Sequence, residues 1–171
     1  MAPRRAWSRA IALACCQIAL LALGCGSTQA PPDAPAGITL TGPWQAGGTL
    51  PTRYTCVGEG LRPLLRWSGA PAGARELAIV VSDPDAPGGR FIHWTAWGIP
   101  PRAHAVPRGV PQGTPWKPPC PPMGDKPHRY IFEIYALGKP SGLKAGAGYD
   151  TVIAALKGAL AHGQLVGRFG R

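Results

Sequence analysis

The chain has 171 residues, enough for one domain of ordinary size, and a formal net charge of +10. Hydrophobic residues make up 45% and charged residues 15% of the sequence, a balance that excludes an intrinsically disordered protein. The basic residues are scattered, with no run and no aromatic interleaving of the type found in RNA-binding proteins, so the charge does not indicate a nucleic-acid-binding protein.

The first 25 residues have the pattern of an export signal. Three arginines among the first nine residues are followed by a mostly apolar stretch, residues 10–24, that is too short to span a membrane. The segment Leu21–Cys25 resembles a bacterial lipobox. We therefore expect residues 1–25 to be a lipoprotein signal peptide that ends at Cys25, the lipidated residue. The alternatives are an uncleaved anchor or an ordinary signal peptidase site.

An exported lipoprotein would be anchored in the membrane and face the periplasm or the cell surface. Residues 26–37 are rich in Ala and Pro, and we expect them to tether the lipid to one domain, residues 38–171. Without the three arginines of the signal peptide, 15 basic and 8 acidic residues leave a net charge of +7. This charge suits either a solvated basic surface or attraction to anionic lipid headgroups.

Cysteine usage is consistent with an oxidising compartment. Cys15 and Cys16 would leave with the signal peptide, and Cys25 would carry the lipid, so Cys56 and Cys120 remain. Two remaining cysteines in an exported protein indicate one disulfide, with two free thiols as the alternative.

The pattern of apolar residues predicts a mostly β domain with one helix. We expect strands at residues 38–41, 64–67, 77–82, 91–99, 129–137 and 164–169. The strand at 77–82 is apolar on both faces, as in the centre of a sheet. The helix is expected from Thr151 to Ala161, with Asp150 as its N-cap and Gly163 as a stop signal.

Two proline-rich loops carry the polar residues that could form a site. The first, Asp83-Pro84-Asp85-Ala86-Pro87, follows the central strand. It is stiff, because proline fixes its own φ angle and restricts the backbone conformation of the residue before it. His93 follows in the next strand, where strict alternation puts it on the same face as Trp97. The second loop leads to His128 at the start of another strand. We expect Asp83, Asp85, His93 and His128 to converge on one cavity at the strand ends.

These motifs resemble the phosphatidylethanolamine-binding protein family, in particular its bacterial Raf-kinase-inhibitor-like branch. The resemblance covers residues 38–171, and the matching segments are the 83–87 loop, His93-Trp94, Cys120-Pro121-Pro122, His128-Arg129-Tyr130 and the last strand. It implies a large central antiparallel sheet packed on a second, smaller sheet, with a helix near the C-terminus.

The resemblance also implies non-covalent binding of a small anion or a phosphoethanolamine-like headgroup. The ligand-binding residues that it implies are Asp83, Asp85, His93, His128, Tyr130, Pro122 and Gly124. Imidazole and backbone N–H groups donate to phosphate, and a carboxylate accepts from an ammonium group. Because two acids would repel a plain anion, we expect a preference for zwitterionic headgroups. We also expect Tyr130 to be turned to the opposite face from His128 unless the strand begins irregularly.

Two departures from the family pattern concern the pocket. Arg62 stands where the family has serine and could add a cation near the pocket, and the segment before Cys120 is short, so that Trp116 could form one wall. Trp94 is expected in the core.

Two other functions are alternatives to ligand binding. One is a protein-interaction or inhibitor module that acts on an envelope protein or a protease. The other is a metal-assisted hydrolase, since two Asp and two His could hold a divalent metal. The sequence contains no G-x-S-x-G motif, and the family is not known to depend on a metal. We therefore expect no enzyme activity, no cofactor and no metal.

Overall fold

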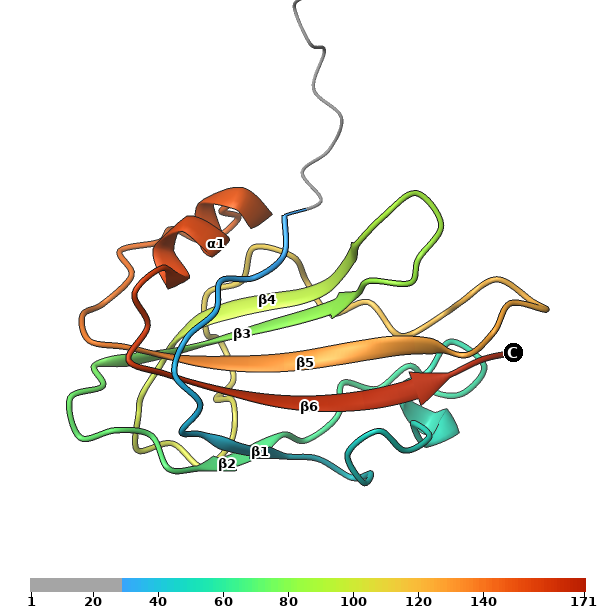
Figure 1. Ribbon diagram of the computed structural model, residues 1–171, viewed down its shortest axis with the longest axis horizontal. Helices are drawn as coiled ribbons and strands as arrows, with labels where there is room; N and C mark the ends of the chain where they lie inside the picture. The colour runs from blue at the N-terminus through green and yellow to red at the C-terminus, as the bar shows by residue number, and fades with distance from the viewer. Residues whose placement is uncertain (1–28) are drawn as a thin grey trace, which may run out of the picture.

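The computed structural model describes residues 29–171, which form a mostly β domain (Figure 1). The signal peptide, Cys25 and the first residues of the expected tether lie outside the described residues. The elements in chain order are β1 (Thr39–Thr41), the short 3-10 helix η1 (Thr52–Tyr54), β2 (Arg66–Ser68), β3 (Glu76–Asp83), β4 (Phe91–Ile99), β5 (His128–Leu137), α1 (Tyr149–Leu156) and β6 (Ala161–Phe169). No helix of this described part is long and apolar enough to cross a membrane.

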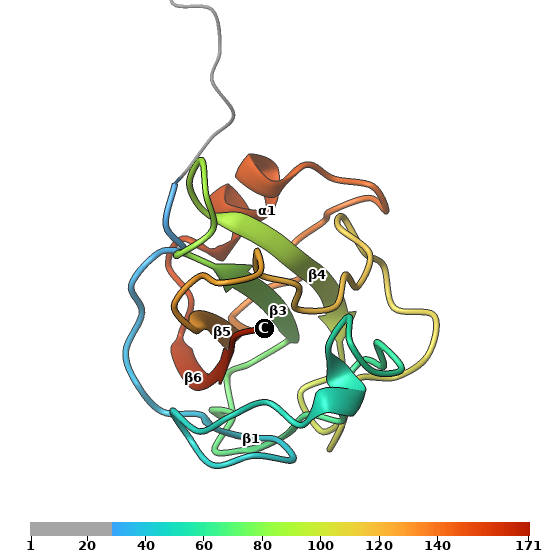
Figure 2. The same ribbon diagram turned by 90° about the vertical axis from the view of Figure 1, so that its right-hand side faces the viewer.

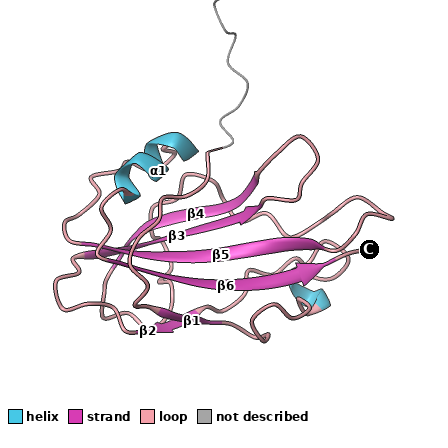
Figure 3. Cartoon of the chain, viewed as in Figure 1, coloured by secondary structure: helices cyan, strands magenta, loops and turns pink. Residues whose placement is uncertain are grey.

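A four-stranded antiparallel sheet in the order β4-β3-β5-β6 forms the centre of the fold. The small sheet β1-β2 packs below one face, and α1 covers part of the other, as Figure 3 shows. All eight residues of β3 are buried, because this strand has a neighbour on each side and packing on both faces. The fold class predicted from the sequence is confirmed.

The two faces of the central sheet have separate apolar cores. The face toward β1-β2 buries aromatic side chains such as Trp44, Trp94 and Phe132. The face toward α1 buries Trp97 and Tyr135 against the apolar side of the helix. Each large side chain buried in this way stabilises the fold by roughly 1.5–3 kcal/mol relative to an exposed position.

Four strand ends meet at one end of the central sheet. The register pairs Asp83 at the end of β3 with Phe91 at the start of β4, and His128 at the start of β5 with Phe169 at the end of β6. This end lies on the right in Figure 1 and faces the viewer in Figure 2. The antiparallel order thus brings both predicted loops to the same end of the molecule.

The helix is shorter than the sequence predicted. It starts at Tyr149 with Gly148 as its N-cap, so the expected cap at Asp150 is wrong. It ends at Leu156 because Gly158 takes a left-handed conformation, with φ of 77°, which terminates helices. Chain reversal at this glycine lets β6 start at Ala161, three residues before the predicted strand.

Residues 29–37, which we call the N-terminal strap, lie against the domain, although they fall in the expected tether. The hydroxyl of Tyr149 donates to the Gln29 carbonyl at 2.9 Å, and that of Tyr135 donates to the Pro32 carbonyl at 3.2 Å. The His162 N–H donates to the Pro35 carbonyl at 2.8 Å. The domain therefore binds the chain from Gln29 onward.

Candidate functional site

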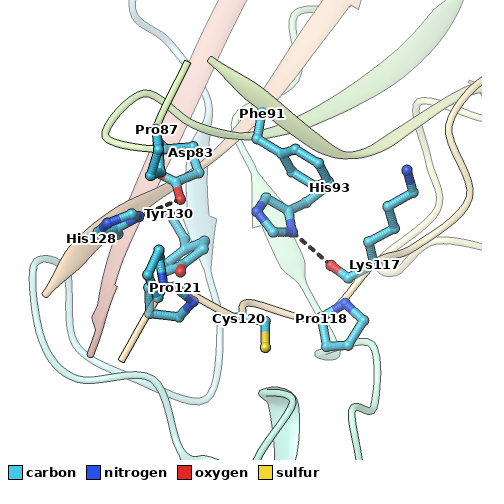
Figure 4. Close-up of a pocket in the computed structure, with 12 residues that line it drawn as sticks. Asp83, Pro87, Phe91, His93, Lys117, Pro118, Cys120, Pro121, His128 and Tyr130 are labelled. Carbon is cyan, nitrogen blue, oxygen red and sulfur yellow. Dashed lines mark hydrogen bonds and ion pairs between the residues drawn. The ribbon is translucent and has the colours of Figure 1, made fainter. Parts of the chain in front are cut away.

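A cavity of about 400 Å³ opens where the four strand ends meet. Its polar lining residues come from β3, β4, β5 and the segment before Cys120, as Figure 4 shows. The full lining is Asp83, Ala86, Pro87, Phe91, His93, Lys117, Pro118, Cys120, Pro121, Pro122, His128 and Tyr130. We call it the strand-end cavity. Five of the seven predicted ligand-binding residues line it: Asp83, His93, His128, Tyr130 and Pro122.

Asp83 and His128 form a buried pair on one side of the strand-end cavity. His128 Nδ1 donates to Asp83 Oδ2 at 2.8 Å, and Asp83 Oδ1 accepts from the backbone N–H of Asp85 at 2.8 Å. Asp125 Oδ2 lies 3.5 Å from His128 Nε2. Burial disfavours the imidazolium, but Asp83 and Asp125 outweigh it and raise the pKa of His128. The pair therefore favours a protonated His128, which donates from both nitrogens.

His93 reaches the cavity through an irregularity in β4. Val81 pairs with Trp94 and Ser82 pairs with Ile92, so the register skips His93, as in a β-bulge. The imidazole lies edge-on to the Tyr130 ring, 5.2 Å between centroids, on the face opposite to the core of Trp97. The expectation that strict alternation puts His93 on the face of Trp97 is therefore wrong, because the extra residue of the bulge turns the His93 side chain to the other face.

The hydrogen bonds of His93 determine its tautomer. Its Nδ1 lies 2.8 Å from the Lys117 carbonyl oxygen, which can only accept, so Nδ1 carries the hydrogen. The Lys117 N–H donates in return to the His93 carbonyl at 2.8 Å. Burial lowers the pKa of His93 and outweighs the Lys117 hydrogen bond and the Asp83 charge. Its other ring nitrogen, Nε2, is turned toward the Asp83 side of the cavity (Figure 4).

Tyr130 contributes a hydroxyl that is buried and has no hydrogen-bond partner among residues 29–171. Burial, together with the nearby Asp83 and Asp85 charges, raises the pKa of Tyr130, so the hydroxyl stays neutral. The expectation that Tyr130 and His128 face opposite sides is wrong. They are two positions apart on a regular strand, and residues i and i+2 share a face.

Asp85 and Gly124 lie outside the strand-end cavity, so the expected convergence of four side chains holds only for Asp83, His93 and His128. The Asp85 carboxylate binds Arg129 through two hydrogen bonds, at 2.6 and 2.9 Å, and accepts its backbone N–H at 2.8 Å. This pairing lowers the pKa of Asp85 to about 2. Because Arg129 neutralises Asp85, only one of the two acids that were expected to repel a plain anion and favour a zwitterionic ligand can do so.

Lys117 is the lining residue that the sequence analysis missed most clearly. Its ammonium nitrogen lies 5.2 Å from the centroid of the Phe91 ring, which also lines the cavity. The cation expected from Arg62 is elsewhere, since that guanidinium stacks 4.6 Å above the Trp94 ring. Trp94 is in the core, as expected. No sequence motif marked Lys117, because its position in the cavity depends on the backbone hydrogen bonds between residues 111–117 and β4.

The wall that contains Lys117 and Pro118 is tied to a neighbouring loop by a disulfide. Cys56 and Cys120 are bonded, with their Cα atoms 5.3 Å apart, and the Cys56 N–H donates to the Pro119 carbonyl at 3.0 Å. Trp116 does not line the cavity. Its Nε1 donates to the Gly60 carbonyl at 3.0 Å, and its ring packs near Trp94 and Phe132.

The polar groups of the cavity hold one another in place. Asp83 uses both oxygens to hold His128 and the Asp85 backbone, so it orients the site. Within residues 29–171, no three His, Cys, Asp or Glu side chains are grouped as metal ligands. The arrangement can donate to an anion from the Tyr130 hydroxyl and from protonated His128, whereas the Lys117 ammonium is turned away from these two residues (Figure 4).

Comparisons with known proteins agree on one family. The family model for phosphatidylethanolamine-binding protein matches residues 41–170. A UPF0098 protein of Pyrococcus horikoshii is 38% identical over 141 residues, covering 71% of this chain and 71% of that protein. A Mycobacterium tuberculosis protein named "Putative lipoprotein LppC" is 39% identical over 158 residues, covering 84% of this chain and 76% of that one. A Chlamydia trachomatis crystal structure, described as a phosphatidylethanolamine-binding protein homologue, has a TM-score of 0.73 and 30% identity, covering 79% of this chain and 98% of that one.

Proposed function

Since the chain belongs to the phosphatidylethanolamine-binding protein family, we propose that it binds a small anion or a phospholipid headgroup non-covalently in the strand-end cavity. The Tyr130 hydroxyl carries this proposal. A buried hydroxyl without a protein partner is unfavourable by about 1–3 kcal/mol unless something else accepts its hydrogen bond. An anion oxygen in the cavity would accept from it.

The charges around the hydroxyl support an anionic ligand. His128, whose pKa is raised, and Lys117 line the cavity, whereas Asp83 is the one carboxylate among the twelve lining residues and is paired with His128. Hydrogen bonds from charged donors to phosphate are about twice as strong as neutral ones. The phosphate part of a headgroup can therefore accept from the Tyr130 hydroxyl and from protonated His128.

We further propose that the protein acts outside the cytoplasm and is held at a membrane by a lipid on Cys25. The lipobox-like segment Leu21–Cys25 supports this location, as does the M. tuberculosis relative with a lipoprotein name. The basic surface of the domain would favour anionic lipids nearby.

Substitution of one tyrosine hydroxyl tests the binding site. Tyr130→Phe should weaken both phosphate and phosphoethanolamine by roughly tenfold or more, because it removes a buried hydrogen bond to a charged ligand. It should change the free energy of unfolding by less than about 1 kcal/mol, because no protein hydrogen bond is lost. Isothermal titration calorimetry and urea denaturation measure the two quantities.

Tyr135→Phe is the matched control. The Tyr135 hydroxyl lies on the other face of the sheet, where its one hydrogen is shared between Glu133 Oε1 at 3.1 Å and the Pro32 carbonyl at 3.2 Å. Its removal should therefore destabilise the protein and leave anion affinity unchanged. A wild-type protein that binds neither ligand would refute the proposed function, and unchanged affinity in Tyr130→Phe would remove the hydroxyl from the site.

A further inference from the structure

We infer that the strand-end cavity selects an oxyanion that keeps a proton, such as hydrogenphosphate or the monoanion of a phosphomonoester, over one without a proton, such as sulfate. The inference rests on the proposed function, because it concerns the ligand of the same cavity. It follows from the kinds of hydrogen-bonding group that line the cavity: Tyr130 and protonated His128 can donate, and His93 can only accept while it is neutral.

The donors account for the negative oxygens of the ligand. Tyr130 has an O–H without a partner among residues 29–171, and protonated His128 has an N–H at Nε2, which also lies 3.5 Å from Asp125 Oδ2. Neither of these groups distinguishes phosphate from sulfate, because both anions offer tetrahedral oxygens of similar size. Discrimination between phosphate and sulfate must come from a group that binds an oxygen carrying a hydrogen and disfavours one without it.

His93 is such a group. Its Nδ1 hydrogen is held by the Lys117 carbonyl, so Nε2 presents a lone pair to the cavity. A P–OH group can donate to this lone pair, whereas a bare oxygen would face it with another lone pair and leave both groups unpaired. The same principle explains why a site built to bond one hydrogen rejects an analogue that lacks it.

The surroundings of His93 keep its Nε2 unprotonated at neutral pH. The charged and titratable groups that face it are Asp83, which favours the imidazolium, and Lys117, which opposes it. Tyr130 is neutral and edge-on to the ring, and the charge of His128 is shared with Asp83. Burial at 4% exposure is the largest influence and favours the neutral ring.

The primary experiment compares inorganic phosphate with sulfate on the wild-type domain at pH 7 by calorimetry. Phosphate should bind at least about tenfold more tightly, which corresponds to one hydrogen bond to a charged group. As the pH falls toward the pKa of His93, the ring becomes a donor, so sulfate affinity should rise more than phosphate affinity. Equal affinity at pH 7 overturns the inference alone, whereas binding of neither anion overturns the proposed function as well.

Two variants locate the selectivity. His93→Leu should reduce the preference for phosphate to less than about twofold, mainly through weaker phosphate binding. His104→Leu removes an exposed histidine outside the cavity, so the preference should persist. A preference that survives in His93→Leu overturns the inference.

A measurement on the unsubstituted protein guards against misfolding of the His93 variant. Long-range ¹H–¹⁵N spectra should show an unprotonated Nε2 on His93 in the free protein and a shift toward a hydrogen-bonded nitrogen when phosphate is added. No change at this nitrogen on saturation with phosphate contradicts the inference.

Phosphoethanolamine and glycerophosphoethanolamine separate P–OH donation from ammonium donation. Both carry the ammonium, but only the monoester can have a P–OH group, with a second pKa of about 6. At pH 6 the monoester should bind at least about fivefold more tightly, given one extra hydrogen bond. Equal binding would mean that the ammonium donates to His93, and it would overturn the requirement for a protonated oxyanion.

Discussion

His128 and His93 line the same cavity, yet their surroundings move their pKa values in opposite directions. Around His128, Asp83 and Asp125 outweigh burial and raise the pKa. Around His93, burial outweighs the Lys117 carbonyl and Asp83 and lowers it. His128 is therefore more readily protonated than a free imidazole and His93 less readily, so the two rings favour the roles of cationic donor and neutral acceptor that the proposed ligand requires.

The opposite shifts predict opposite pH dependences of stability. The stabilisation from His128 is complete below the unfolded-state pKa of about 6.5 and is lost as pH rises through its raised folded-state pKa. The stabilisation from neutral His93 is present above about 6.5 and is lost as pH falls through its lowered pKa. Relative to wild type, His128→Leu should therefore lose stability mainly at low pH, and His93→Leu mainly at high pH.

Urea denaturation from pH 5 to pH 8 measures this prediction. The exposed His104 offers the control variant His104→Leu, which should parallel the wild type across the range. Parallel profiles for both cavity variants would contradict the opposite shifts.

Single residues of the site were predictable only where local sequence marked them. Asp83, His93 and His128 stand beside proline-rich loops at strand ends, and the resemblance to a family pointed to the same positions. The partners of Asp85 and Lys117 lie 44 and 24 positions away, at Arg129 and His93. Such pairings are decided by tertiary packing, so a pattern read along the chain could not find them.

At the scale of elements, the strands were predicted better than the helix. β4 begins and ends where alternation placed it, and every other strand boundary differs by at most three residues. The helix end differs by five residues, because the conformation of Gly158 decides it and apolar periodicity continues past this glycine. The bulge at His93 likewise depends on the partner strand β3 and has no signature in β4 alone.

The segment that forms the Lys117 wall gives a prediction at the scale of elements. It is tied to β4 by the hydrogen bonds from the Lys117 backbone N–H to the His93 carbonyl and from His93 Nδ1 to the Lys117 carbonyl. The Cys56–Cys120 disulfide ties it to the loop after η1. The double variant Cys56→Ser, Cys120→Ser removes a crosslink between residues 64 positions apart. It should lower the free energy of unfolding by up to about 4 kcal/mol, as the chain-entropy estimate gives for a loop of this size. Anion affinity should fall as well, because the wall gains freedom.

Thiol titration and calorimetry check the two parts of this prediction. In the denatured, unreduced wild-type domain, a thiol reagent should find no free thiol at Cys56 or Cys120. Two reactive thiols would contradict the disulfide, and unchanged stability of the double variant would contradict its structural role.

At the scale of the whole molecule, the N-terminal strap would limit how far the domain can stand from a membrane once Cys25 carries a lipid. Gln29 is bound by Tyr149, so only four residue steps separate Cys25 from the first contact with the domain. Four extended residues span at most about 14 Å. A lipid on Cys25 would therefore hold the domain close to the lipid surface, a shorter distance than a free tether through residue 37 would allow.

This arrangement predicts that the lipid, rather than the basic surface, holds the protein at the membrane. Cys25→Ser should move the protein from the membrane fraction to the soluble fraction, because the modified thiol is lost. Cys15→Ser and Cys16→Ser are matched controls in the signal peptide and should stay membrane-bound. Because a net charge of +7 could retain some protein on anionic lipids, the fractions are washed with about 1 M salt, which shortens the screening length to about 3 Å. A Cys25→Ser protein that resists this wash, or a mature N-terminus other than Cys25 in mass spectrometry, would contradict the lipobox at Leu21–Cys25.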